Sequence, residues 1–213
     1  DAVYGMALGA TQGWYEGLTN KPIVISKSRT WSDLYHLFPQ SKIVVTIRDL
    51  RDVVESFIRV NEKAKVLHTF HDGLGLLPAM TEDEKYHYFF NTPNPVSGVL
   101  QNELARMHVA HNTYENRVLF IRYEDLIVDP VKQLNKVYDF LEEDRFRHDL
   151  NNIQQSELYE HDMAYFRERT SHKVSSSILT KKKESRQLSE SFHQKVVSNN
   201  KPFYEIFYPE VLR

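Results

Sequence analysis

The chain has 213 residues, of which 41% are hydrophobic and 26% are charged, and these values are typical of a folded globular protein. Its 27 basic and 29 acidic residues give a formal net charge of −2, which argues against a protein that coats nucleic acid. Cysteine is absent, so disulfide bonds, cysteine-ligated zinc and a thiol nucleophile are excluded. The length predicts one domain, residues 1–213.

No run of about 18 apolar residues occurs, so no membrane-spanning helix is predicted in this stretch. The absence of cysteine fits a reducing compartment, and we expect a cytoplasmic location. The chain starts at Asp1 without an initiator methionine or a signal-peptide pattern. We therefore expect the printed sequence to lack its true beginning.

The predicted elements begin with a helix in residues 1–20, where glycines at every fourth position allow close packing. Three short apolar segments, residues 22–26, 42–47 and 117–121, are then predicted as strands. They are β-branched and uninterrupted, which is typical of parallel strands that are buried on both faces.

Helices are predicted between and after these strands. Apolar side chains at helical spacing in residues 53–58 predict a helix after the second strand. A longer helix over residues 96–111 has an apolar stripe that includes His111, which we expect to be buried. Asp129-Pro130 is a helix start signal. The expected apolar face of that helix consists of Val131, Leu134, Tyr138 and Leu141.

The order of these elements predicts an α/β fold, a parallel sheet with helices on both faces. Ligands of such sheets bind at the carboxyl ends of the strands. Residues 26–29, 48–51 and 122–125 follow the three strands, and each segment contains arginine or lysine, which favours a phosphate-rich ligand. Residues 161–183 are predicted as a loop or lid over that edge, ahead of a terminal helix near 186–198.

The strongest local motif lies at the end of the second strand. Arg48 ends the strand, and Ser56 lies on the following helix. A guanidinium offers a planar fork for a phosphate, and a serine hydroxyl adds a neutral donor. The alternative is a surface ion pair of Arg48 with Asp49 or Asp52.

At this point the chain resembles a known family. Residues 42–56 are similar to the 3′-phosphate motif of sulfotransferases that use 3′-phosphoadenylyl sulfate (PAPS), particularly the bacterial and tyrosylprotein branch. In that motif a strand runs into an Arg-Asp-x-Arg turn, and a serine follows eight residues after the first arginine, as Ser56 follows Arg48. The resemblance implies a P-loop NTPase-like version of the α/β fold, and it makes Arg48 and Ser56 the ligands of the cofactor's 3′-phosphate.

Residues 122–126 resemble the second widespread motif of these enzymes. The matching tyrosine of the tyrosylprotein sulfotransferases touches the nucleotide, and the resemblance gives this role to Tyr123. Glu124 and Asp125 are interpreted as structural residues that hold arginines, with a catalytic acid pair as the alternative.

Lys27 follows the first predicted strand. A lysine in this place stabilises the transferring sulfuryl group in the enzymes that the chain resembles, so Lys27 is the candidate catalytic residue. A fixed ammonium would offset the charge that spreads over the sulfuryl oxygens in the transition state. A solvated strand-end lysine is the alternative, and Arg29 is a weaker candidate for the same charge.

Residues 178–182 resemble the stretch that brings a serine and lysines over the nucleotide in those enzymes. Thr180 replaces the serine, and a lysine, Lys181, stands where the family has tryptophan. Both are candidate cofactor-binding residues. The next two lysines are interpreted as a solvated charge run.

Two parts of such an enzyme have no match in the sequence. The loop that cradles the 5′-phosphosulfate lies upstream in the family, and nothing before Lys27 can form it. The catalytic base of the tyrosylprotein branch lies near that loop. We expect both to be in residues that the printed sequence lacks, and the alternative is a relative that has lost its activity.

No metal site is predicted. Two histidine pairs have the spacing of metal ligands on one helix face: His68 with His71, and His108 with His111. No carboxylate at a suitable spacing completes a set of metal ligands with either pair. None of the ten histidines is assigned as a catalytic base.

The sequence therefore favours a PAPS-dependent sulfotransferase that needs no metal and acts on a hydroxyl or amine of a small-molecule, glycan or peptide acceptor. The first alternative is a nucleotide or small-molecule kinase of the same fold, with Asp49 or Asp125 as its acid. The second is a non-catalytic module that binds a nucleotide or an anionic glycan. Abundant aromatic residues could line an acceptor pocket, although such residues are more often core: Trp14, Tyr15, Tyr86, Tyr88, Phe89 and Phe90.

Overall fold

The structure is a computed structural model that describes residues 41–64, 79–91, 97–113, 116–153 and 187–213. The predicted first helix, the predicted first strand and the predicted loop at 161–183 lie outside the described residues. Within them, none of the helices combines the length and apolar character that a bilayer-spanning segment needs.

Two strands form a parallel sheet, as predicted. β1 spans Ile43–Ile47 and β2 spans Val118–Arg122, each within one residue of the predicted boundaries. Ile43 pairs with Val118 and Ile47 with Arg122, so both strands end at the same edge of the sheet.

The expectation that both faces of these strands are buried is wrong for β1. Val45 and Ile47 are buried, whereas Val44 is 38% exposed and Thr46 is also exposed. The reason is that α7, the helix on that side of the sheet in the described part of the chain, packs on β2.

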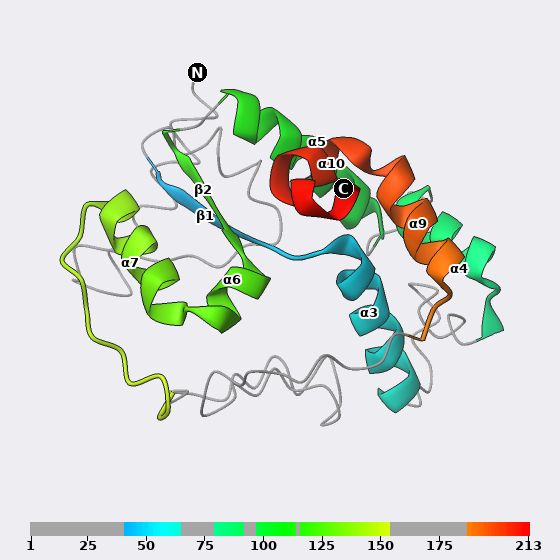
Figure 1. Cartoon of the computed structure of the whole chain (residues 1–213), viewed down its shortest axis with the longest axis horizontal. Helices are drawn as coiled ribbons and strands as arrows, with labels where there is room; N and C mark the ends of the chain where they lie inside the picture. Colours follow the sequence, from blue (N-terminus) through cyan, green and yellow to red (C-terminus); the bar gives the residue numbers. More distant parts are fainter. Residues whose placement is uncertain (1–40, 65–78, 92–96, 114–115, 154–186) are drawn as a thin grey trace, which may run out of the picture.

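Eight helical segments surround this sheet in the described residues. They are α3 (Leu50–Ala64), α4 (Glu82–Phe90), α5 (Ser97–Thr113), α6 (Tyr123–Val128), α7 (Pro130–Leu141), α9 (Glu190–Asn199), α10 (Lys201–Phe207) and the 3₁₀ helix η2 (Pro209–Leu212). α7 lies on one side of the two strands, and α5 and α10 lie on the other (Figure 1). The described part of the chain thus has helices on both sides of a parallel sheet, as predicted.

The main core lies between β1, β2 and the helices α3, α4, α5, α9 and α10. Its aromatic residues include Tyr86, Tyr88, Phe89 and Phe90, each no more than 6% exposed. These four residues are confirmed as core.

Two sequence expectations about the helix faces are wrong. His111 is exposed, because it lies in the last turn of α5, although its ring still packs against Phe120 and Phe207. In α7 the expectation fails at Val131, which is 57% exposed, and at Gln133, which is buried. The other expected residues of that face, Leu134, Tyr138 and Leu141, are half-buried. The helix starts as predicted, because the Asp129 side chain accepts a hydrogen bond from the Lys132 N–H.

The terminal helix predicted near 186–198 begins later and is followed by a second helix. Ser189 is the N-cap of α9, and its hydroxyl accepts a hydrogen bond from the Phe192 N–H at 3.1 Å. α10 starts two residues after α9 ends and buries three aromatic residues, Phe203, Tyr204 and Phe207.

Candidate functional site

The predicted ligand edge of the sheet brings Arg48 and Tyr123 together. Each residue directly follows one of the two strands, and the preceding residues, Ile47 and Arg122, are register partners. The Arg48 guanidinium lies over the Tyr123 ring, with its Cζ 4.7 Å from the ring centroid. This is a cation–π contact, which supports the guanidinium without supplying a hydrogen-bond acceptor to its N–H groups.

Arg48 lacks an acidic partner among the described residues. Its side chain is half-buried, and its buried Nε donates no hydrogen bond to another described group. The alternative of an Arg48–Asp49 ion pair is wrong, because Asp49 binds Arg51 instead. Arg122 also has a buried Nε without a hydrogen bond, but its guanidinium pairs with Glu210. A half-buried guanidinium that lacks both an acceptor for Nε and an acidic partner is the arrangement that an anionic ligand would complete.

Ser56 lies on α3, about 9 Å along the helix axis from Leu50 at its start. Its side chain is half-buried, and its hydroxyl makes no hydrogen bond to another described residue. The structure shows no direct contact between Ser56 and Arg48. A common ligand would have to bridge them.

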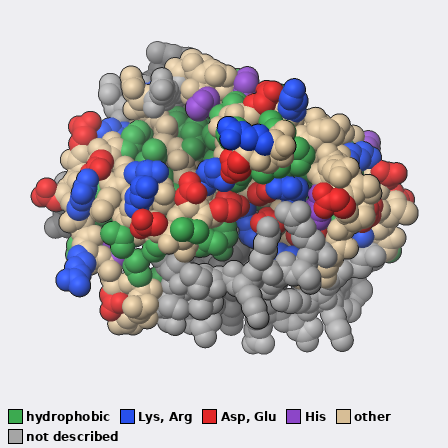
Figure 2. All heavy atoms as spheres, viewed as in Figure 1, with side chains coloured by type: hydrophobic (Ala, Val, Ile, Leu, Met, Phe, Trp, Pro, Cys, Tyr) green, Lys and Arg blue, Asp and Glu red, His purple; other side chains and the backbone are tan. Residues whose placement is uncertain are grey.

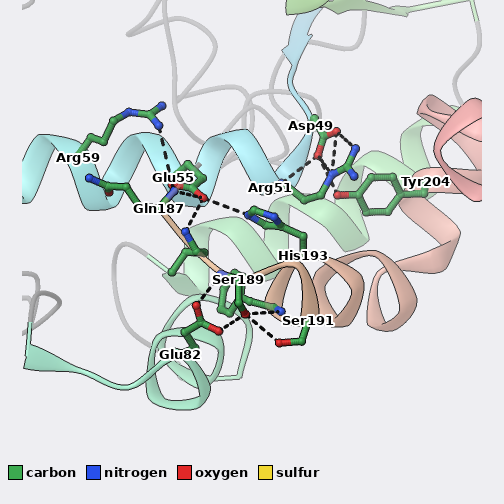
Figure 3. Close-up of polar contacts among 12 residues, drawn as sticks. Asp49, Arg51, Glu55, Arg59, Glu82, Gln187, Ser189, Ser191, His193 and Tyr204 are labelled. Carbon is green, nitrogen blue, oxygen red and sulfur yellow. Dashed lines mark hydrogen bonds and ion pairs between the residues drawn. The ribbon is translucent and has the colours of Figure 1, made fainter. Parts of the chain in front are cut away.

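Asp49 is fully engaged within the protein. Arg51 Nε donates to both carboxylate oxygens, at 3.0 and 3.1 Å, and the Tyr204 hydroxyl donates to Oδ1 at 3.0 Å (Figure 3). Burial raises the pKa of the Asp49 carboxyl, but the hydrogen bonds and charge of Arg51 and the bond from Tyr204 outweigh it and hold the pKa below its usual value. Asp49 is therefore unsuited to be the metal-holding acid that the kinase alternative requires.

Glu124 connects the ends of the two strands. Its Oε1 accepts the backbone N–H of Asp49 at 3.2 Å, and its Oε2 accepts the Tyr208 hydroxyl at 2.8 Å. Burial and the bond to Glu124 raise the pKa of Tyr208, so its phenol stays protonated and donates. Glu124 therefore has a structural role, as interpreted from the sequence, but its partners are a backbone amide and a phenol and not an arginine.

Arg122, the last residue of β2, lies among several groups from the C-terminal part of the chain. Its guanidinium pairs with Glu210 and lies 4.2 Å from the Tyr208 ring centroid. Asp125 is 4.0 Å from its Nε, so the prediction that Asp125 accompanies an arginine agrees with the structure.

Glu55 is an important residue that the sequence analysis missed. Its side chain is 1% exposed, and it accepts hydrogen bonds from the backbone N–H groups of Gln187 and Leu188 and from His193 Nε2, at 3.0–3.1 Å (Figure 3). It thereby attaches the segment before α9 to α3, one residue from Ser56. The sequence did contain a signal for a buried acid, because Glu55 lies between Val54 and Ile58 of the apolar face of this helix.

The other predicted site residues lie outside the described residues. These are Lys27, Arg29, Thr180 and Lys181. Among the described residues, no three histidine, aspartate or glutamate side chains gather to hold a metal ion. On the face shown in Figure 2, basic and acidic side chains are interspersed, so attraction for an anion has to arise locally, at a residue such as Arg48.

Comparison with known proteins adds a family assignment. The model of the sulfotransferase family matches residues 24–148, which is more than half of the 213 residues. The matched stretch includes Lys27, Arg48, Ser56 and Tyr123. Searches of curated proteins and of solved structures found no match.

Proposed function

The chain belongs to the sulfotransferase family, and on this premise we propose that it transfers a sulfuryl group from PAPS to a hydroxyl or amine. The acceptor would be a small molecule, a glycan or a peptide. Within this proposal, Arg48 and Ser56 bind the 3′-phosphate of the nucleotide, and Tyr123 contacts the nucleotide. Thr180 and Lys181 would hold phosphate oxygens.

One observation carries the proposal most directly. Arg48 lies on Tyr123 at the carboxyl edge of the parallel sheet, and its buried Nε has no acceptor among the described residues. Parallel sheets bind ligands at this edge. A phosphate group supplies the acceptor oxygens that a buried guanidinium needs, so these residues fit the 3′-phosphate of PAPS.

Transfer requires one bond to form and one to break. The acceptor oxygen or nitrogen would bond to sulfur as the bond between sulfur and the 5′-phosphate oxygen breaks, and that electron pair leaves with adenosine 3′,5′-bisphosphate. The proton of the acceptor goes to a base that we do not assign to any residue. Lys27 is proposed to stabilise the charge on the sulfuryl oxygens, which is greatest in the transition state.

Calorimetry with two nucleotides tests the proposed binding mode. Adenosine 3′,5′-bisphosphate should bind more tightly than adenosine 5′-monophosphate by about 2–4 kcal/mol, because the 3′-phosphate gains a charge-assisted bond and a hydroxyl bond. This corresponds to a ratio of dissociation constants from about 30 to several hundred.

Variants assign this preference to Arg48. Arg48→Ala should reduce the ratio to about five, the share that the Ser56 hydroxyl contributes. Arg145→Ala should leave the ratio unchanged, because Arg145 pairs with Asp139 on the exposed surface. Equal affinity of the wild type for both nucleotides would contradict the proposal. Tight binding of the bisphosphate without turnover of PAPS on any acceptor would favour the non-catalytic module.

A further inference from the structure

α10 and the residue that caps its C-terminal end contribute two buried tyrosines, four residues apart, to the ligand edge of the sheet. Tyr204 donates its hydroxyl to Asp49 at 3.0 Å, and Tyr208 donates its hydroxyl to Glu124 at 2.8 Å. Both tyrosines are at most 2% exposed. Asp49 lies between β1 and α3, and Glu124 lies in the first turn of α6, so residues 204–208 hold the chain just after both strands.

Each tyrosine ring lies beside an arginine, although Arg51 pairs with the acid that its tyrosine binds, whereas Arg122 pairs with Glu210. Arg51 lies over the Tyr204 ring at 5.9 Å, and Arg122 lies over the Tyr208 ring at 4.2 Å. Each unit therefore contains an acid, a phenol and an arginine. Asp49 is buried and Glu124 is half-buried, and each carboxylate accepts at least two hydrogen bonds. Rearrangement of either unit would therefore leave polar groups unpaired.

A hydrogen bond from the Asp49 N–H to Glu124 joins the two units, and it lies next to Arg48, the residue proposed to bind the phosphate. The N–H that Glu124 accepts at 3.2 Å belongs to the peptide group between Arg48 and Asp49. Glu124 therefore fixes the orientation of the backbone that carries Arg48. The residue before Glu124 is Tyr123, whose ring supports the Arg48 guanidinium. The same short segment thus holds Arg48 by its backbone and by its side chain.

We infer that Glu124 and Tyr208 are positioning residues that hold Arg48 and Tyr123 in the geometry that binds a 3′-phosphate. Neither residue needs to touch the ligand. Glu124 fixes the Arg48 peptide, and Tyr208 holds Glu124 from the C-terminal helix. This inference rests on the proposed function, because it concerns the same nucleotide site.

The test measures the preference for the 3′-phosphate in four full-length variants. The readout is the ratio of calorimetric dissociation constants for adenosine 5′-monophosphate and adenosine 3′,5′-bisphosphate. Glu124→Leu removes both acceptor oxygens and should lower the ratio about tenfold, and Tyr208→Phe removes only the hydroxyl and should lower it about threefold to fivefold.

Two variants serve as controls. Glu124→Gln should keep the ratio within about twofold, because the amide oxygen can accept the Asp49 N–H and the amide NH₂ can donate to the Tyr208 oxygen. Tyr138→Phe removes the same atom from a tyrosine on α7, whose hydroxyl bonds to His148 at 2.8 Å, and should leave the ratio unchanged.

The outcomes separate the inference from the proposed function. An unchanged ratio in Glu124→Leu and Tyr208→Phe, even with a lower melting temperature, would overturn the inference, because the residues would then only stabilise the fold. Equal losses in Glu124→Gln and Glu124→Leu would also overturn it, since charge and not position would matter. If Glu124→Leu does not fold, Tyr208→Phe decides. A wild type without preference for the 3′-phosphate would overturn the proposed function, and the inference with it.

Discussion

Three arginines lie near the carboxyl edge of the sheet, and their partners separate their roles. Arg51 binds Asp49, and Arg122 binds Glu210. Arg48 contacts an aromatic ring but has no acidic partner among the described residues. The first two arginines therefore stabilise the turns, whereas Arg48 keeps hydrogen-bonding capacity for a ligand.

Lys27→Ala tests the separation of chemistry from binding. Turnover with PAPS should fall about a hundredfold or more, because the lost ammonium acts on charge that develops in the transition state. The affinity for adenosine 3′,5′-bisphosphate, measured by calorimetry on the full-length protein, should change little. Full turnover in this variant would show that Lys27 is only a solvated lysine at the end of a strand.

Asp49→Asn should show a pH-dependent loss of stability. Because the pKa of Asp49 is lowered in the folded protein, its ionised form stabilises the fold above the unfolded-state pKa of about 4, and this stabilisation disappears as the pH falls through the folded-state pKa. We expect the variant to be less stable by about 1.5–3 kcal/mol at pH 7, since two partners hydrogen-bond to the charge.

Urea unfolding of wild type and variant from pH 7 down to pH 3 measures this difference, which should narrow below about pH 4. Asp139→Asn is the matched control, because Asp139 pairs with Arg145 in an exposed position and should show a far smaller change. A difference between Asp49→Asn and wild type that stays constant over this pH range would contradict the prediction.

At the scale of elements, the N-terminal end of α9 is attached to two other helices. Glu55 of α3 accepts the N–H groups of Gln187 and Leu188, and Glu82 of α4 accepts the Ser189 N–H at 2.7 Å. These bonds fix where the chain enters α9. They also attach this segment to the helix that carries Ser56 of the candidate site.

Glu55→Ala should destabilise the protein by about 2–5 kcal/mol, because it leaves buried donors of Leu188 and His193 without their acceptor. Denaturant unfolding at neutral pH measures the loss. Glu205→Ala, which removes an exposed partner of Lys201 in α10, should change stability much less. Similar stabilities of the two variants would show that the Glu55 bonds contribute little.

Some elements are readable from local sequence signals, and others are not. The boundaries of β1 and β2 were predicted within one residue, because each strand is an uninterrupted apolar run that contains β-branched residues. α4 was missed despite its capping box, in which Thr81 and Glu84 bond reciprocally. α10 was also missed, although Pro202 stands in its first turn, where proline is common.

At the scale of the whole molecule, the candidate site was only partly predictable. The meeting of Arg48 and Tyr123 follows from the rule that parallel strands end at one edge. The partners of the buried acids do not follow from any local pattern. Glu55 meets His193, which is 138 residues away, because distant helices pack around one core. Periodicity reports which face is buried but does not identify the group opposite a buried acid.

Tyr204 of α10 and Tyr208 at its C-terminal end have a consequence for how the protein is made. Asp49 and Tyr204 are 155 residues apart, and Glu124 and Tyr208 are 84 apart. A ribosome releases the chain from its N-terminus, so both strand-end turns are synthesised long before the helix that completes their hydrogen bonds. Contacts across such sequence distances also form late, because they require large loops to close. A nascent chain would therefore acquire its full affinity for an anion only after Tyr208 had left the ribosome.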